Sequence, residues 1–153
     1  MKILKYRGVD PGIKTGYAEW DAVKQQFTEV KTANFWTVYN EAELPLRMFP
    51  HDLLTTVYVI ENPALNSPVF DRGVERKDHA QTIARHVGSN QREAQLLIEG
   101  IRILGYQVIE VKPKKTSSRK GKITHEDFVR LTRYKGRTSQ HARDAAMMVF
   151  GRI

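Results

Sequence analysis

The chain has 153 residues, no cysteine and a net charge of +8, from 25 Lys and Arg against 17 Asp and Glu. This length fits one domain, residues 1–153, and the lack of cysteine excludes a disulfide framework, a thiolate zinc site and a catalytic thiol. The positive charge favours a polyanionic partner, either nucleic acid or an anionic membrane. Because no apolar run approaches the roughly 18 residues of a membrane span, we expect a soluble intracellular protein without a membrane segment.

An antiparallel hairpin is expected at the beginning of the chain. Residues 3–9 have the pattern of a strand that stops at an Asp-Pro-Gly turn, and residues 15–20 resume it. A third strand is expected over residues 26–31. Between residues 33 and 52 we expect only a short helix, because Pro45 and Pro50 would interrupt a long one.

The next segments predict a parallel part of the same sheet. Residues 55–60 are β-branched nearly throughout and form the clearest strand, with Glu61 at its end. Residues 62–80 are polar and predict an irregular loop. Residues 89–104 have apolar positions at helical spacing, and a strand over residues 107–111 follows closely enough to complete a right-handed βαβ unit.

The last third of the chain combines basic and small residues. Residues 112–122 hold six basic residues and no acid, which predicts a flexible basic loop. Thr124 resembles the start of a capping box for a short helix that is expected to end at residues 135–137. A final helix is expected from about Thr138, with a small apolar stripe that can pack tightly on the sheet, formed by Ala142, Ala145, Ala146 and Val149.

Three acids and a histidine are the candidates for chemistry, although each has an ordinary explanation by itself. Asp10 suits a turn, Glu61 could be a solvated acid at a strand end, and Asp144 could favour the beginning of a helix. His141 lies on the same helix face as Asp144. If the two strands are adjacent and the last helix crosses them, all four side chains converge. Carboxylates suit hard cations such as Mg²⁺, which predicts a metal-dependent phosphodiesterase site.

The same residues resemble a known family. Gly8-Val9-Asp10-Pro11-Gly12 with Gly16-Tyr17-Ala18, Val59-Ile60-Glu61, and His141 to Ala146 are similar to the three acidic motifs of RuvC-type Holliday-junction resolvases, in the ribonuclease-H-like superfamily. The motif order and spacing match over nearly the whole chain. The resemblance implies an α/β fold with a five-stranded mixed sheet in the order 3-2-1-4-5, flanked by helices. It also implies a homodimer that resolves four-way DNA junctions by paired symmetric nicks.

The resemblance also assigns roles to individual residues. Asp10, Glu61, His141 and Asp144 would be the catalytic and metal-binding residues for Mg²⁺ or Mn²⁺, with two ions per site and no small-molecule cofactor, and His141 would either bind metal or orient water. The DNA-binding candidates are Phe70, Arg72, Arg76, Lys112, Lys114, Lys115, Lys120 and Lys122. Family members carry an aromatic residue soon after the strand-end Glu, whereas here Asn62-Pro63-Ala64-Leu65 follows and Phe70 is the first aromatic.

Leu96 and Ile103 form a second apolar stripe on the helix over residues 89–104. This stripe either packs against the same helix of a second copy or lies beneath the long loop that precedes it.

Three other functions remain as alternatives. The first is a broader nuclease of the same superfamily that cuts branched DNA, flaps or RNA/DNA hybrids, although ribonuclease H itself carries its second acid on a helix and not at a strand end. The second is an actin-like phosphate hairpin, which needs two lobes that 153 residues do not supply. The third is a non-catalytic nucleic-acid-binding module, which predicts the loss of an acid, yet all are present.

Overall fold

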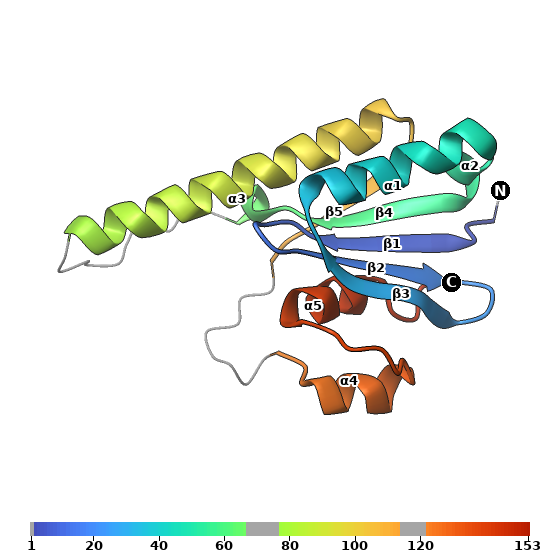
Figure 1. Cartoon of the computed structure of the whole chain (residues 1–153). Coiled ribbons are helices and arrows are strands. Elements are labelled where there is room, and N and C mark those ends of the chain that lie inside the picture. The colour runs from blue at the N-terminus through green and yellow to red at the C-terminus, as the bar shows by residue number, and fades with distance from the viewer. Residues whose placement is uncertain (1, 67–76, 114–121) are drawn as a thin grey trace.

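A mixed five-stranded sheet in the order β3-β2-β1-β4-β5 is the centre of the molecule (Figure 1). The computed structural model of the chain describes residues 2–66, 77–113 and 122–153. The strands are β1 (Lys5–Asp10), β2 (Thr15–Asp21), β3 (Gln26–Ala33), β4 (Thr56–Glu61) and β5 (Gln107–Val111). Pairing is antiparallel from β3 to β1 and parallel from β1 to β5. The predicted α/β fold and strand order are therefore confirmed.

Helices cover both faces of the sheet and create two apolar cores (Figure 1). The face under α1 and α3 buries Val9, Tyr58 and Ile60. The face under α5 and α4 buries Trp20, Val57 and other side chains. Because β1 and β4 are central and covered on both faces, nearly all their residues are buried, as expected for parallel strands between two helical layers.

The prediction of a short, proline-interrupted helix before β4 was wrong. A 14-residue helix, α1 (Phe35–Met48), contains Pro45 in its last turn, and a short helix, α2 (Asp52–Thr55), follows it. Val38 and Ala42 bury the inner side of α1 against the sheet, and the ring of Phe35 stacks on that of Tyr39. This packing outweighs the backbone hydrogen bond that proline removes, an example of tertiary contacts overriding local preference.

The long helix after β4 begins earlier than its sequence pattern indicated. The prediction of an irregular loop over residues 62–80 was wrong at both ends, because Pro63–Leu65 form a 3₁₀ turn, η1, and α3 spans Lys77–Ile103. Its N-terminal half projects beyond the sheet (Figure 1). The helical spacing of Ala80, Ile83, Ala84 and Val87 in that half was a signal that the prediction missed. The helix ends at Ile103, within one residue of the expected end at residue 104, and Gly105 follows it with a φ of +98° that is readily adopted only by glycine.

The last two helices pack on the face of the sheet opposite α1. The hydroxyl of Thr124 caps α4 (His125–Thr132) by accepting a hydrogen bond from the backbone amide of Asp127, which confirms the expected helix start. The helix ends at Thr132 and not at residues 135–137, because Arg133 adopts a left-handed conformation with φ of +62°. Ser139 caps α5 (Gln140–Val149), close to the expected beginning at Thr138.

Small residues allow α5 to lie very close to the sheet. Ala142, Ala145, Ala146 and Val149 are all fully buried, so the predicted small stripe is confirmed. Gly8 and Gly16 face it from β1 and β2, where a Cβ atom would overlap the carbonyl groups of Ala145 and His141. Within the described ranges, no helix has the length and apolar character needed to cross a membrane.

Candidate functional site

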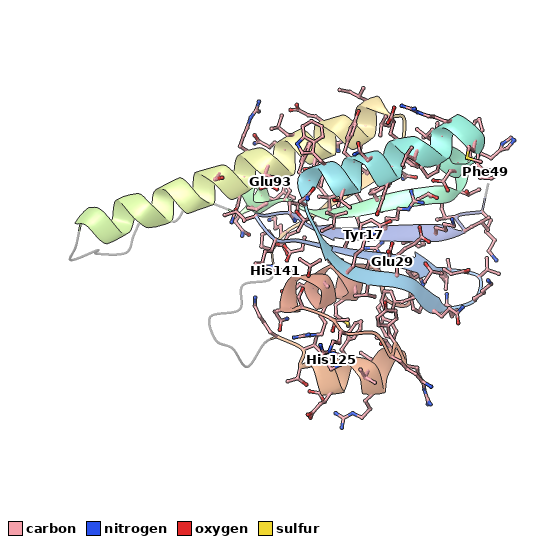
Figure 2. The ribbon with its side chains drawn as sticks, in the orientation of Figure 1. Tyr17, Glu29, Phe49, Glu93, His125 and His141 are labelled. Atoms are coloured by element: carbon pink, nitrogen blue, oxygen red, sulfur yellow. The ribbon has the colours of Figure 1, made fainter. Side chains whose placement is uncertain are left out.

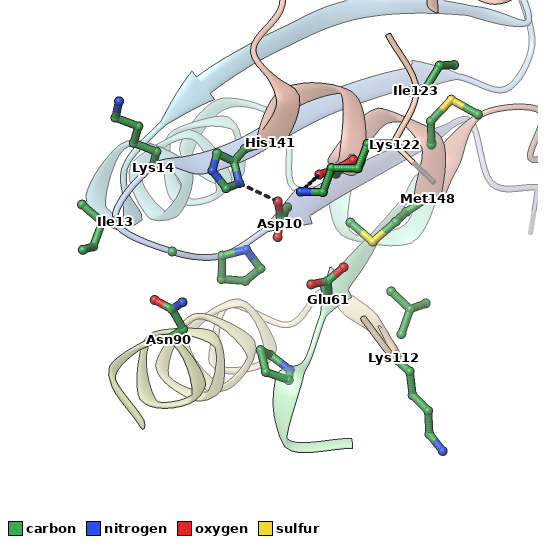
Figure 3. A pocket seen from close by; sticks show the side chains of 16 residues that line it. Asp10, Ile13, Lys14, Glu61, Asn90, Lys112, Lys122, Ile123, His141 and Met148 are labelled. Atoms are coloured by element: carbon green, nitrogen blue, oxygen red, sulfur yellow. Dashed lines mark hydrogen bonds and ion pairs between the residues drawn. The ribbon is translucent and has the colours of Figure 1, made fainter. Parts of the chain in front are cut away.

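The candidate site lies at one edge of the sheet, where β1 and β4 end. Asp10 is the last residue of β1 and Glu61 the last of β4, and the two strands pair in parallel, with Val9 opposite Ile60. The carboxyl ends of adjacent parallel strands meet at the same edge, so both side chains face one cleft of about 840 Å³. His141 and Asp144 line the same cleft from α5 (Figure 3).

A side-chain contact joins Asp10 on β1 to His141 on α5. The imidazole Nδ1 of His141 lies 3.0 Å from the Oδ2 atom of Asp10. Asp10 is buried, whereas the His141 side chain is half exposed. Residues 141 and 144 are one turn apart on the same face of α5, so the helix that positions His141 also brings Asp144 to the cleft.

Asp144 has two partners beside the cleft. Its Oδ1 atom accepts a hydrogen bond of 2.8 Å from the side-chain amide of Gln140, one turn earlier in α5. Its Oδ2 atom lies 3.5 Å from the ammonium group of Lys122. Lys122 thus places a positive charge at the cleft and partly balances the three carboxylates.

The acids in this cleft disfavour one another's charge. Burial, followed by the charges of Asp10 and Asp144, raises the pKa of Glu61 from 4.5 to about 7, although Lys122 opposes the shift. Burial also raises the pKa of Asp10, against the opposing hydrogen bond and charge of His141. The three carboxylates are therefore close enough to disfavour one another's ionisation, a setting in which a bound cation would be favourable.

The donor types fit a hard divalent cation, but they are not gathered around one point. Carboxylate oxygens with one imidazole suit Mg²⁺ or Mn²⁺. In the described part of the chain, no three acidic or histidine side chains are close enough together to hold one ion. Asp10 instead contacts His141, and Asp144 contacts Lys122. The metal-binding and catalytic roles of these residues consequently stay predictions.

Several cleft residues were not among the sequence candidates. Ile13 and Lys14 line the cleft from the turn between β1 and β2, and Asn90 lines it from α3. Ile13 is an apolar side chain with 77% of its surface exposed. The position of Lys14 four residues after Asp10, in the same turn, was a usable signal, as was the position of Gln140 four residues before Asp144.

The candidate DNA-binding residues divide into two groups. Lys112 and Lys122 line the cleft and are exposed. Lys112 extends away from the acids in Figure 3, whereas the amine of Lys122 points toward them. The other candidates lie outside the described residues: Phe70, Arg72, Arg76, Lys114, Lys115 and Lys120.

The fold agrees with that of a known DNA-processing protein. RuvC from Thermus thermophilus, in a complex with Holliday junction substrate, aligns with a TM-score of 0.51 at 14% identity, over 96% of this chain and 89% of that chain. A second Thermus thermophilus RuvC structure aligns with a TM-score of 0.41 at 14% identity, over 95% of this chain and 90% of that chain. A Fowlpox virus resolvase in a complex with substrate Holliday junction DNA aligns with a TM-score of 0.46 at 14% identity, over 95% of this chain and 97% of that chain. No family model and no curated protein matches the sequence. The first of these likenesses shows a RuvC-like fold.

Proposed function

We propose that this protein is a metal-dependent, structure-selective DNA endonuclease that resolves four-way junctions by paired symmetric nicks. The observation that carries the proposal is the single cleft lined by Asp10, Glu61, His141 and Asp144, which come from three distant parts of the sequence. The RuvC-like sheet supports it, and so does the net charge of +8, because DNA is a polyanion.

The acids of the cleft would hold the cation. Asp10, Glu61 and Asp144 are the proposed ligands of two Mg²⁺ or Mn²⁺ ions, which, when bound, supply an activated water and stabilise the leaving oxygen of the phosphodiester. Asp10 engages the Nδ1 atom of His141 and fixes the plane of the imidazole. The Nε2 atom is then the nitrogen available to hold a water or a substrate oxygen.

The cations beside the cleft would bind the DNA backbone. Lys112 and Lys122 are exposed, and both line the cleft that holds the acids. Phosphate contacts of this kind position a strand without reading its sequence. In the proposed reaction, Lys122 would hold the scissile phosphate beside the carboxylates, and Lys112 would contact the strand further from them.

Paired nicks require two sites with a fixed relation, which a two-fold dimer supplies. Leu96 and Ile103 on α3 have 40% and 82% of their surfaces exposed, so this stripe of α3 is available to a second copy. Exposed apolar side chains of this size favour an interface when they lie together on one helix. We propose α3 as the contact between the two copies.

Cleavage of matched DNA substrates by purified protein tests the proposal. With Mg²⁺, we expect symmetric nicks in a labelled four-way junction and little cutting of a duplex of the same sequence. Asp10→Asn should abolish cleavage while junction binding persists, because the amide keeps the shape of the side chain and removes its charge. Glu126→Gln, a change at an exposed acid on α4, is the matched control and should cleave as the unmodified protein does.

Two results would contradict the proposal. Mg²⁺-dependent cleavage by clean Asp10→Asn protein would refute the role of that carboxylate. Preferred cutting of flaps, forks or RNA/DNA hybrids would support the broader nuclease of the same superfamily, and binding without cleavage of any substrate would support a non-catalytic module.

A further inference from the structure

A short basic segment between α4 and α5 is not explained by the cleft. Residues 133–139, which we call the basic strap, have no helical structure and alternate between exposed and less exposed positions. The exposed members are Arg133, Lys135, Arg137 and Ser139, so three cations and a hydroxyl group share the outer side. Tyr134, Gly136 and Thr138 lie on the inner side.

The inner residues hold the basic strap against the body of the protein. The ring of Tyr134 packs edge-on to Phe27 and Phe128, and its hydroxyl accepts the backbone amide of Val30 at 3.2 Å. Any side chain at Gly136 would overlap the ring of Tyr134, so the backbone passes directly over that ring.

A second anchor fixes the C-terminal end of the basic strap. The carbonyl of Thr138 accepts a 2.8 Å hydrogen bond from Arg143, and its hydroxyl lies 2.9 Å from the Nδ1 atom of His125. His125 on α4 lies on the same side of the sheet as His141 on α5 (Figure 2). The outer cations are therefore presented by a backbone that is already ordered, which lowers the entropic cost of binding a ligand.

The charge of the basic strap is not balanced locally. Among the described residues, no carboxylate lies within ion-pair distance of Arg133, Lys135 or Arg137, whereas the nearby Arg130 pairs with Asp127. Three adjacent cations without counter-charges repel one another and favour a polyanion. Arg137 precedes His141 by four residues, so their Cα atoms are at most about 14 Å apart.

We propose that the basic strap binds the phosphate backbone of a DNA arm that leads away from the cleft. The inference rests on the proposed function, and it adds a contact surface that none of the candidate lysines provides. Arg133, Lys135 and Arg137 are all exposed within five residues, so their charges are close enough together to meet one stretch of backbone phosphates. Ser139 extends the row toward the cleft with a hydroxyl donor.

Nucleic acid fits the basic strap better than an acidic protein or an anionic membrane. The outer side chains are cations and a hydroxyl, and the one aromatic residue of the segment, Tyr134, faces inward. Protein interfaces draw on exposed aromatic anchors, and membrane surfaces on apolar side chains that enter the lipid. Exposed cations without aromatic or apolar side chains among them suit the phosphates of a nucleic-acid backbone.

The salt dependence of junction binding tests the inference. Affinity for a four-way junction is measured in EDTA, where no cleavage occurs, over a series of salt concentrations. The triple variant Arg133→Gln, Lys135→Gln, Arg137→Gln should lower the slope of log K against log salt by about two to three, because each lost phosphate contact removes about 0.9. In Mg²⁺ its KM should rise while kcat stays within about twofold, because the lost contacts are remote from the reacting phosphate.

Three controls separate this inference from a general charge effect. The triple variant Lys2→Gln, Lys24→Gln, Arg47→Gln removes the same charge at exposed positions elsewhere and should leave most of the slope intact. The double variant Arg133→Lys, Arg137→Lys keeps the three charges of the basic strap and should keep the slope of the unmodified protein. Thermal unfolding of each variant shows whether the fold is retained, and the lysine variant supports the inference only if it binds as the unmodified protein does.

The outcomes distinguish this inference from the proposed function. A protein that binds no DNA overturns both. If the unmodified protein cleaves junctions but the strap variant keeps the full slope, or the control triple loses as much, only the inference is overturned. The same holds if the strap variant loses affinity for phosphatidylserine vesicles and keeps its DNA slope.

Discussion

Glu61 is the residue whose protonation should leave a measurable trace. Burial and the charges of Asp10 and Asp144 raise its pKa from 4.5 to about 7, so between these pH values the folded protein retains a proton that the unfolded chain has lost. Stability falls with pH wherever the folded state binds more protons. In metal-free protein, we therefore expect the contribution of Glu61 to the free energy of unfolding to fall as pH rises from 4.5 to 7.

Urea unfolding at a series of pH values checks this expectation. Glu61→Gln has no proton to lose in this window. As pH rises from 4.5 to 7, the unmodified protein should therefore lose stability relative to Glu61→Gln. Glu126→Gln serves as the control, because Glu126 is exposed. A stability difference between the unmodified protein and Glu61→Gln that does not change with pH would contradict the raised pKa.

The identities of the four main cleft residues could be proposed from the sequence, because each stands in a short motif at a recognisable strand end or helix face. The hydrogen-bond and ion-pair partners of these residues could not be proposed from the sequence. The hydrogen bond from Gln140 to Asp144 and the ion pair with Lys122 depend on side-chain orientation. Likewise, no sequence pattern indicates that Asp10 contacts His141 across 131 positions.

At the scale of elements, the close approach of α5 to the sheet depends on glycine. Gly8→Ala should destabilise the protein by at least about 1–3 kcal/mol, because the new methyl group overlaps the carbonyl of Ala145 and the backbone must move. Such a shift would also displace His141 and Asp144, so cleavage should fall together with stability.

Gly88→Ala is the matched control for this prediction. Among the residues that the structure describes, a Cβ atom at Gly88 meets nothing within 4 Å, and the residue lies inside α3. Alanine there should stabilise the protein by about 0.5–1 kcal/mol through its higher helix propensity. Chemical denaturation of both variants gives the comparison, and equal stabilities would contradict the role of Gly8.

A buried charge network joins β1 to α2 and β2. The guanidinium of Arg7 is 6% exposed and lies 2.9 Å from a carboxylate oxygen of Glu19 and 3.2 Å from one of Asp52. Burial alone would raise the pKa values of both acids, but Arg7 and other hydrogen bonds outweigh it and hold them below their ordinary values.

Removing this arginine should destabilise the fold severely. Arg7→Met leaves two carboxylates without their partner and should cost about 3–5 kcal/mol in unfolding experiments. Adding Glu19→Gln and Asp52→Asn should recover part of the loss. Lys24→Met at an exposed turn should change stability by less than about 0.5 kcal/mol. A small effect of Arg7→Met would mean that water replaces the guanidinium.

The elements differ in how well the sequence predicted them. All five strands were placed correctly to within two residues, since each pairs its apolar pattern with a clear turn. The extent of α1 and α3 was missed for opposite reasons. Pro45 argues against a helix that packing nevertheless stabilises. The first half of α3 lies beyond the sheet (Figure 1), and its apolar residues at helical spacing stand among many charged and polar residues, which favoured a loop.

At the scale of the whole molecule, we expect the protein in solution to have the molar mass of a dimer. Leu96→Glu with Ile103→Glu places two charges on the exposed stripe of α3 and should convert a dimer into a monomer. Leu131→Glu, at an equally exposed apolar residue of α4, should leave the dimer intact. Light scattering after size exclusion measures both, and a monomeric unmodified protein would remove α3 as the contact.

The contact between Asp10 and His141 has a consequence for synthesis. A ribosome makes β1 first and α5 last, so a growing chain holds one half of the cleft long before the other half exists. Until α5 docks, Gly8 and Gly16 and the apolar face around them are uncovered. A chain interrupted before α5 should therefore be unable to cleave DNA and prone to aggregation. The cleft is complete only once α5 has packed on the sheet.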